Sequence, residues 1–251
     1  MTATVCANRQ TLCAESAARI EHLIANALEI RGQAVVCMTG GTTARQVYEA
    51  IAAHQRHAPR LAWNQVRFFW GDEREVPADH PDSSYGMAAS ALLSHVPVDA
   101  RLVHPIPADG RDAETAARAY DVTLQQTVFA SRAEWAFDLT LLGVGADAHI
   151  ASLFPGAAEL ERSSSERVVA VPAAAKRGRR VTLTAATLLD ARRILVFVSG
   201  RDKADAVHAA FSQPEDVPRW PAQILRRAGD RVEWFMDSAA DGRARAARPS
   251  R

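Results

Sequence analysis

The stretch LLGVGADAHIASLFPG, residues 141–156, is the most informative part of the sequence, because it combines the end of a predicted strand with a loop of candidate catalytic residues. It continues an apolar run, FDLTLL (137–142), which predicts a buried strand. The run stops at a loop with two glycines, an aspartate and a histidine: Gly143, Gly145, Asp147 and His149. Loops at strand ends carry the active sites of α/β proteins. A histidine beside an aspartate in such a loop is a candidate general base.

Further apolar runs alternate with segments of helical spacing. Strands are predicted at 34–38, 66–70, 101–106, 168–171, 180–184, 194–200 and 232–236. Helices are predicted at 10–30, 43–53, 84–93, 112–129, 202–211 and 221–227, with Gly32 ending the first. This alternation predicts an α/β protein of three α/β/α layers with a mainly parallel sheet. We expect one domain over 1–237 and a disordered Arg/Ala-rich tail over 238–251.

Composition narrows the classes of partner. The 251 residues are 48% hydrophobic, and 30 basic against 29 acidic side chains leave a formal charge of +1. No global field is available for nucleic acid or an anionic membrane, so any anion site must be local. Three cysteines without a CxxC pair argue against disulfides and structural zinc. With no N-terminal signal pattern and no run of membrane-spanning length, we expect a cytoplasmic protein.

A glycine loop follows the strand at 34–38. The segment MTGGTTARQVY (38–48) combines Gly40 and Gly41 with the hydroxyls of Thr42 and Thr43 at a helix start. Free N–H groups and the helix dipole make such a loop suitable for a phosphate. The alternative is an ordinary turn with Thr43 as the N-cap. The loop has neither the GK[ST] of a Walker loop nor a GxGxxG, so nothing indicates ATP or NAD.

A charged loop is predicted after the strand at 66–70. The segment WGDEREVPADHPDSSYGMA (70–88) places Asp72, Glu73 and Arg74 together. Arg74 can bind an anion, and Asp72 can orient either a sugar hydroxyl or Arg74 itself. The alternative is a solvated charge cluster at a strand end.

Two cations lie at other strand ends. Arg180 opens the strand at 180–184, and Lys203 follows the strand at 194–200. Both can complete a phosphate pocket, although exposed Arg and Lys side chains are common. A parallel sheet gathers such loops at one edge, so the four segments together favour one site. We expect His54, His57, His80 and His208 to be surface or structural residues.

These segments resemble, in order and over nearly the whole length, the 6-phosphogluconolactonases. Residues 137–156 are similar to DLxLLGMGxDGHTASLFPG, and 70–88 to WGDERxVPxxHxDSNxGMA. The glycine loop is similar to SGGSTP. RVTLT (180–184), the SGxxKA spacing of 199–204 and PAQIL (221–225) match the C-terminal pattern of the family. The motifs at 70–88 and 137–156 are long and specific to this family, so the agreement is not a chance one.

The resemblance implies a sugar-phosphate isomerase-like fold (a modified Rossmann fold) shared with glucosamine-6-phosphate deaminases. It implies hydrolysis of 6-phospho-D-glucono-1,5-lactone to 6-phospho-D-gluconate, the second step of the oxidative pentose phosphate pathway, without cofactor or metal. His149 would be the catalytic acid/base, with Asp147, Arg74 and Asp72 in the active site. The substrate phosphate would be held by Gly40, Gly41, Thr42, Thr43, Arg180 and Lys203.

The chain departs from the family pattern at four positions. Ala148 replaces a glycine, which adds strain of about 1 kcal/mol if the position needs a positive φ. Ile150 replaces Thr, Ser84 replaces Asn, and Ala44 replaces Pro. None of these carries proton transfer or phosphate binding.

Two rival functions stay open. Glucosamine-6-phosphate deaminases are similar through the DGHIA segment, and Ile150 leans towards them, but they continue with an Asn-Glu pair. Here Ser152, Leu153 and Phe154 follow, and no acid appears until Glu159. The second rival is a non-catalytic sugar-phosphate effector domain, which would need a DNA-binding module. About thirty residues before the first predicted strand leave no room for one.

Overall fold

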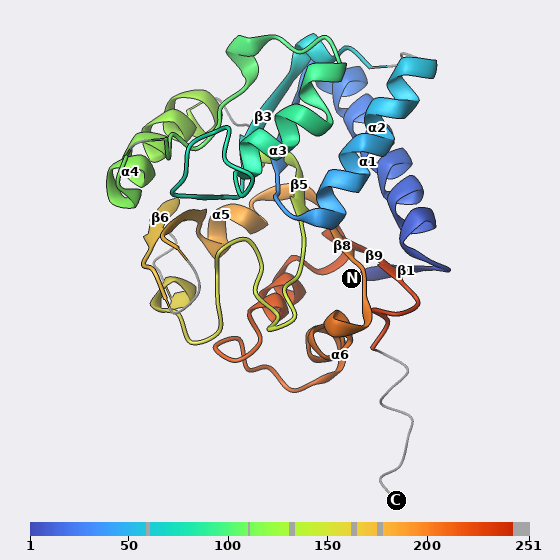
Figure 1. Ribbon diagram of the computed structural model, residues 1–251, viewed down its shortest axis with the longest axis vertical. Coiled ribbons are helices and arrows are strands. Elements are labelled where there is room, and N and C mark those ends of the chain that lie inside the picture. Colours follow the sequence, from blue (N-terminus) through green and yellow to red (C-terminus); the bar gives the residue numbers. More distant parts are fainter. Residues whose placement is uncertain (59–60, 110, 131–133, 162–164, 175–177, 243–251) are drawn as a thin grey trace, which may run out of the picture.

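Six parallel strands form the central sheet of the computed structural model, which describes residues 1–58, 61–109, 111–130, 134–161, 165–174 and 178–242 (Figure 1). Their order is β1-β9-β8-β5-β2-β3. The bounds are β1 Thr2–Cys6, β2 Ala34–Met38, β3 Val66–Trp70, β5 Phe137–Leu142, β8 Ala191–Val198 and β9 Val232–Asp237. The mainly parallel α/β architecture expected from the sequence is confirmed.

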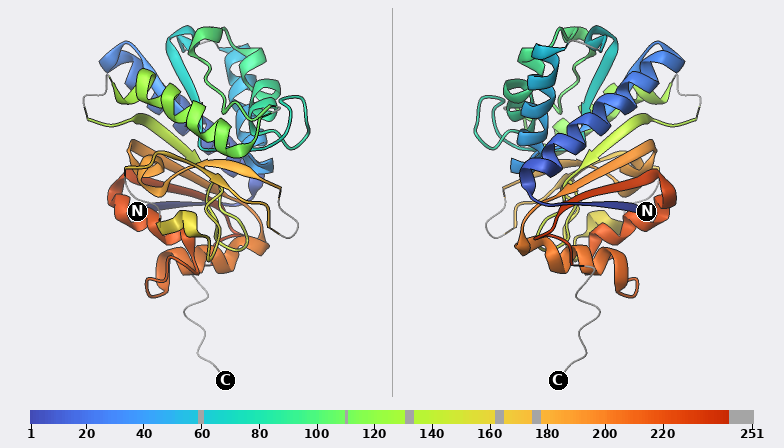
Figure 2. Two further views of the ribbon diagram at one scale, coloured as in Figure 1. Left: turned by 90° about the vertical axis from the view of Figure 1, so that its left-hand side faces the viewer. Right: turned by 90° about the vertical axis from the view of Figure 1, so that its right-hand side faces the viewer.

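Helices cover both faces of this sheet and make three layers. They are α1 Arg9–Arg31, α2 Thr42–His57, α3 Ser84–Ala91, α4 Ala113–Leu124, α5 Ala185–Leu189 and α6 Ala204–Ser212. Helices α1 and α2 lie on one side of the sheet, with α6 and the 3₁₀ segment η7 (Pro221–Arg231) on the other (Figure 2). Because both faces are covered, strands such as β2 are apolar throughout.

The boundaries of α1 follow from its end residues. Asn8 caps the N-terminus by accepting from the N–H of Thr11 at 2.9 Å. Gly32 ends the helix with a φ of 69°, in the left-handed region that glycine adopts without strain. The helix and its stop at Gly32 are confirmed.

A second, antiparallel sheet grows from the carboxyl end of β3. It contains β4 (Asp72–Arg74), β7 (Arg180–Leu183) and β6 (Val168–Val171), in the order β4-β7-β6. The prediction that residues 72–74 lie in a loop is therefore wrong. In this sheet Arg74 is the register partner of Arg180, and Asp72 is the partner of Thr182.

Three other local predictions need correction. The strand expected at 101–106 is a 3₁₀ turn, η3 (Ala100–Leu102), followed by one isolated bridge between Val103 and Phe68. Pro105 has no N–H to extend that ladder. The helix expected over 112–129 ends in a π-helical turn over Gln125–Phe129. The segment 221–227 belongs to a longer 3₁₀ segment with a kink at Gly229.

Strand β1 was not expected, and it places the first residues of the chain beside β9. Its burial pattern is mostly exposed, as suits an edge strand, and it pairs with β9. Beyond β9, Ser238 donates its N–H to the Cys6 carbonyl at 2.9 Å and Ala240 is fully buried. The packed chain thus continues to Gly242, past the boundary expected at 237, and residues 243–251 lie outside the described residues.

No helix in the described ranges is long and apolar enough to cross a bilayer.

Candidate functional site

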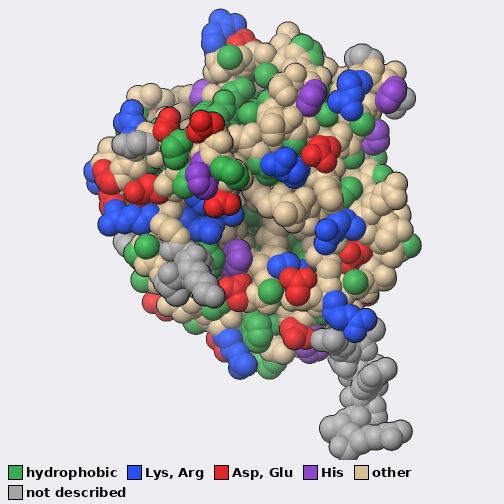
Figure 3. Space-filling model, in the orientation of Figure 1, with side chains coloured by type: hydrophobic (Ala, Val, Ile, Leu, Met, Phe, Trp, Pro, Cys, Tyr) green, Lys and Arg blue, Asp and Glu red, His purple; other side chains and the backbone are tan. Residues whose placement is uncertain are grey.

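A cavity of about 200 Å³ opens at the carboxyl ends of the central strands. Around a hollow on this face, side chains of Lys and Arg, Asp and Glu, and His gather (Figure 3). The cavity lining includes Thr39–Ala44, Asp72, Arg74, Ser84, Gly143–Gly145, His149, Ala151, Arg180, Phe197–Ser199 and Lys203. The site residues expected from the sequence all line this cavity except Asp147, which contacts the cavity residue His149.

The glycine loop presents a helix N-terminus to the cavity. Gly41, with a φ of 103°, is the N-cap of α2, and no side chain caps the helix. The alternative that Thr43 is the N-cap is wrong, because Thr42 and Thr43 already lie inside the helix. Tyr48 anchors the loop by accepting from Thr39 N at 3.1 Å and donating to Thr39 O at 3.0 Å. The first-turn N–H groups and the helix dipole are thus available to an anion.

His149 and Asp147 form a close pair, which spacing alone could not settle. Nδ1 of His149 lies 2.5 Å from Oδ1 of Asp147. The pair is part-exposed, with 32% of the His149 side chain and 46% of the Asp147 side chain accessible. The hydrogen bond from His149 is the main cause that lowers the pKa of Asp147 to about 2, against burial, which raises it. Asp147 is the group that orients the imidazole.

Two backbone features shape this loop. A Cβ on Gly145 would lie 2.0 Å from His149 Nδ1, so the imidazole occupies the space that any side chain at 145 would need. Ala148 has a φ of 67° and Ala151 a φ of 46°, both in the left-handed region. The condition under which Ala148 adds strain is therefore met, at a cost of about 1–2 kcal/mol. Ala148 O accepts from Ala222 N at 2.9 Å, which helps to hold the turn.

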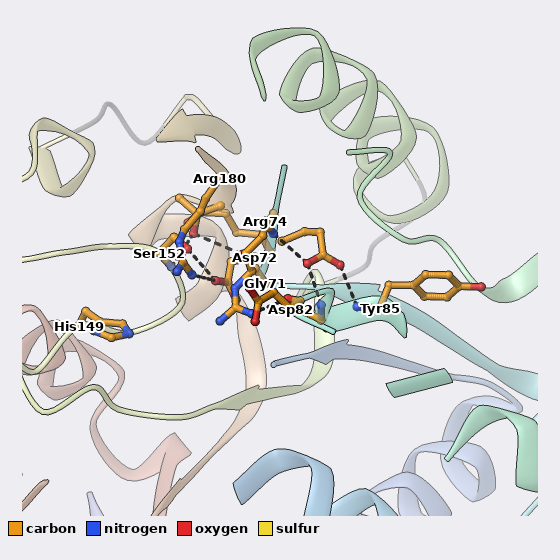
Figure 4. A network of polar contacts seen from close by, with 12 residues as sticks. Gly71, Asp72, Arg74, Asp82, Tyr85, His149, Ser152 and Arg180 are labelled. Carbon is orange, nitrogen blue, oxygen red and sulfur yellow. Dashed lines mark hydrogen bonds and ion pairs between the residues drawn. The ribbon is translucent and has the colours of Figure 1, made fainter. Parts of the chain in front are cut away.

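Arg74 and Arg180 lie beside each other in the small sheet, and Asp72 contacts Arg180. Asp72 Oδ2 accepts from Ser152 Oγ at 2.7 Å and lies 4.0 Å from Arg180 Nη1. The sequence left open whether Asp72 orients Arg74; its partners in the structure are Ser152 and Arg180. Arg74 instead donates Nη1 to the carbonyl of Asp82. Figure 4 shows this cluster, with His149 lying apart from it.

Glu73 is structural. It is buried, and its carboxylate accepts from the N–H groups of Arg74, Ser84 and Tyr85 at 2.7–2.8 Å and from Ser83 Oγ at 3.0 Å. Burial raises the pKa of Glu73, while the three backbone hydrogen bonds lower it. Glu73 therefore ties β4 to the N-terminus of α3 and fixes Arg74 in place.

Phe154 connects the imidazole to the cation. Its ring centroid lies 4.7 Å from that of His149, and Arg180 Cζ lies 5.5 Å from the same ring. The side chain is almost fully buried. Phe154 belongs to the stretch 141–156, yet sequence reasoning gave it no role. It provides one apolar surface against which both polar groups rest.

The loop that carries Lys203 is held by a network that the sequence did not reveal. Lys203 lines the cavity and pairs with Asp202 at 3.1 Å. Ser199 Oγ donates to Asp237 Oδ2 at 2.5 Å and accepts from Arg9 Nε at 2.7 Å. Asp237 Oδ1 also accepts from Gly200 N. Arg9 carried no sequence signal, because only the pairing of β1 with β9 brings α1 to this edge.

No group of three or more His, Cys, Asp or Glu side chains within the described ranges is arranged to hold a metal ion. The site instead combines an oriented imidazole, three cations and an open helix N-terminus. This arrangement can move a proton at one end of a ligand and bind an anionic group at the other.

Comparisons with known proteins show which proteins this chain resembles in sequence and fold. The family model of glucosamine-6-phosphate isomerases/6-phosphogluconolactonase matches residues 7–234. A 6-phosphogluconolactonase of Synechocystis is 36% identical over 236 residues, which cover 93% of this chain and 94% of that protein. One of Mycobacterium tuberculosis is 38% identical over 235 residues, covering 91% and 92%. A solved structure of 6-phosphogluconolactonase from Trypanosoma brucei superposes with a TM-score of 0.80 at 27% identity, covering 98% of each chain.

Proposed function

The chain belongs to the family of glucosamine-6-phosphate isomerases and 6-phosphogluconolactonases, and we propose that its cavity is the active site for lactone hydrolysis. The reaction is hydrolysis of 6-phospho-D-glucono-1,5-lactone to 6-phospho-D-gluconate, in the pentose phosphate pathway. The observation that carries the assignment of the site is the convergence of the His149–Asp147 pair with Arg74, Arg180 and Lys203 around one cavity.

His149 is the proposed acid/base. In the neutral imidazole, Nδ1–H donates to the Asp147 carboxylate, because a carboxylate can only accept. Nε2 then carries the lone pair that takes a proton from the attacking water. The water oxygen bonds to C1 of the lactone, and the ring oxygen leaves with the proton that Nε2 returns. The bond between C1 and the ring oxygen breaks, so the products are a free hydroxyl and a carboxylic acid, which releases its remaining proton to solvent to become the carboxylate, and the imidazole ends neutral. Such positioned catalysis contributes about 10²–10⁴-fold.

Arg74 is the proposed partner of the developing oxyanion. It lines the cavity, and its backbone is fixed by Glu73. A guanidinium has five N–H donors, so the bond to the Asp82 carbonyl leaves others for the substrate. Preorganised donors stabilise charge that forms in the transition state without reorganising.

The proposed phosphate subsite consists of the α2 N-terminus, Arg180 and Lys203. Asp72 is a positioning residue in this proposal, because its contacts are with Ser152 and Arg180. Because the phosphate is remote from the reacting C1, binding it in this subsite orients the lactone against His149.

The deaminase alternative finds no support at the cavity. Asp72 is the one acidic side chain in the described lining, and it is engaged by Ser152. Glu159, the next acid after His149, is buried in the short 3₁₀ turn Ala158–Glu161 and does not line the cavity.

We also propose that the protein works in the cytoplasm. Cys6, Cys13 and Cys37 are all free and buried, which suits a reducing compartment. Fractionation of the native cells, with lactonase activity measured in each fraction, tests this.

The function is tested by acid release from freshly made 6-phosphogluconolactone, corrected for spontaneous hydrolysis. We expect a rate well above background that His149→Ala reduces by two orders of magnitude or more, with retained binding of 6-phosphogluconate. Ammonia release from glucosamine 6-phosphate is the control reaction. Ammonia without lactone hydrolysis would show a deaminase, and near-normal turnover in His149→Ala would remove this residue from its role.

A further inference from the structure

A second hollow, of about 370 Å³ and larger than the first, lies at the amino ends of the central strands, opposite the first cavity. Its lining comes from the end of α1 and the turn after it, the amino ends of β2, β3, β5 and β8, and the segment before β5: Arg31, Gln33, Val35, Arg67, Thr127, Val128, Glu134, Trp135, Ala136, Asp138 and Arg192. None of these residues lines the first cavity. Strands of five or six residues separate the two hollows by about 17–20 Å.

The acidic side chains of this hollow are already neutralised. Asp138 Oδ1 accepts from Arg31 Nη2 at 2.7 Å, and Asp138 Oδ2 accepts from Val35 N at 2.9 Å. Glu134 pairs with Arg192 Nη2 at 3.2 Å. Arg192 Nε also lies 3.9 Å from Asp138 Oδ1, so Arg31 and Arg192 together balance the two carboxylates.

Arg67 is a further cation in this hollow. It lies at the start of β3, half-buried, opposite Val35 in the β2–β3 register. It makes no hydrogen bond or ion pair with any residue of the described ranges. Its charge acts on the interior, because it adds to burial in lowering the pKa of His104. A partly desolvated guanidinium with five open donors is suited to a planar or tetrahedral anion.

Most of the remaining lining is apolar. Val35, Val128, Ala136 and Trp135 border the same hollow, together with the polar Gln33 and Thr127. Trp135 is itself supported by Arg231, whose Cζ lies 4.2 Å from the centre of the ring. A rigid aromatic side chain beside one unpaired cation is typical of pockets that bind small organic molecules.

We propose that this hollow is a binding site for a small organic anion, separate from the active site. The acid group of the ligand, a carboxylate, sulfonate or phosphate, pairs with Arg67. Its apolar or aromatic body lies against Val128 and Trp135. The proposed site lies at the amino ends of the strands, so binding there does not depend on the reaction at their carboxyl ends.

The test uses 1-anilinonaphthalene-8-sulfonate, an aromatic organic anion whose fluorescence rises in apolar surroundings. It is titrated into the folded protein with saturating 6-phosphogluconate in the active site. We expect saturable binding at one site, and binding at least 10-fold weaker in Arg67→Ala and Arg67→Gln. N-phenyl-1-naphthylamine, which has the same aromatic body without the acid, should bind far more weakly to the unmodified protein.

Arg193→Ala is the matched control. Arg193 is a neighbouring arginine on β8 with 42% of its side chain exposed, and it does not line the hollow. We expect it to bind the probe as the unmodified protein does. Lactonase activity and the melting temperature of each variant report that the fold is intact, since Arg67 is remote from the first cavity. The proposal would be overturned if both Arg67 variants bound the probe as tightly as the unmodified protein does. It would also be overturned if 6-phosphogluconate displaced the probe, or if the unmodified protein did not bind the probe at all.

Discussion

Arg74 and Arg180 are register partners across β4 and β7, so two guanidinium groups stand side by side at the cavity. Like charges directly opposite in an antiparallel pair are destabilising. Asp72 lies 4.0 Å from Arg180, and the carbonyl of Asp82 accepts from Arg74. In the proposed function, the phosphate and the developing oxyanion of the substrate are the two negative groups that these arginines bind.

Replacing Arg180 should weaken substrate binding more than it slows turnover. We expect Arg180→Ala to raise KM for 6-phosphogluconolactone by about 10- to 100-fold, the effect of losing a charge-assisted hydrogen bond. The kcat should stay within a few-fold. Steady-state kinetics with 6-phosphogluconolactone and with unphosphorylated glucono-1,5-lactone separate the roles, since the second substrate should be indifferent to the change. An unaltered KM would place the phosphate elsewhere.

A methyl group at position 145 should displace the imidazole of His149, the proposed acid/base. The Cβ of Gly145→Ala would lie 2.0 Å from His149 Nδ1 and 2.6 Å from Asp147 Oδ1, so both side chains must move. We expect kcat to fall by about 10²-fold or more, as for loss of a positioned acid/base. Equilibrium dialysis should show that 6-phosphogluconate still binds.

Gly143→Ala is the matched control in the same loop. A Cβ there meets no atom within 4 Å, and the His149–Asp147 pair should stay intact. We expect its kcat to be near normal, while any rise in KM reflects its place in the cavity lining. If both alanine variants lose kcat equally, displacement of the imidazole is not the cause.

The Asp147 carboxylate should stay charged to unusually low pH. His149 lowers the pKa of Asp147 to about 2, below the ordinary value near 4. A carboxylate whose pKa is lowered by folding stabilises the native state above the unfolded pKa, and this stabilisation is lost as the pH falls from about 4 towards 2. Carboxyl ¹³C shifts measured against pH should therefore show no Asp147 titration between pH 5 and 3.5.

In His149→Ala the same carboxyl should titrate near pH 4, because its hydrogen-bond partner is gone. An identical titration in both proteins would mean that the 2.5 Å contact does not persist in solution.

Arg9 should support the phosphate subsite from outside the cavity. Arg9→Ala removes the donor to Ser199 Oγ, and with it one support of the loop that carries Lys203. We expect KM for 6-phosphogluconolactone to rise about 10-fold with little change in kcat, and Arg9→Lys to recover only part of the loss. Steady-state kinetics provide the measurement, and glucono-1,5-lactone should again be unaffected.

The same helix offers a control for this variant. Arg19 makes a two-pronged ion pair with Glu233, at 2.7 Å for each contact, away from the cavity. Arg19→Ala should lower the melting temperature and leave KM unchanged. If Arg9→Ala behaves in the same way, the role of Arg9 is purely structural.

Sequence patterns predicted the central layers well, because the physics there is local. Strand β2 (AVVCM) is buried on both faces, so it appears as a continuous apolar run. Strand β4 could not be found in this way. Its three residues are all charged, and they become a strand only because β7, more than a hundred positions later, offers its edge.

The polypeptide by itself determined the α/β class, the family and the set of side chains that meet at the cavity, because apolar periodicity and long motifs are written along the chain. The hydrogen-bond partners became known from the folded structure alone: Asp147 with His149, Asp72 with Ser152, and Arg9 with Ser199. Hydrogen bonds require atoms about 3 Å apart in the right direction. That geometry follows from turn conformation and strand register, which residue spacing does not encode.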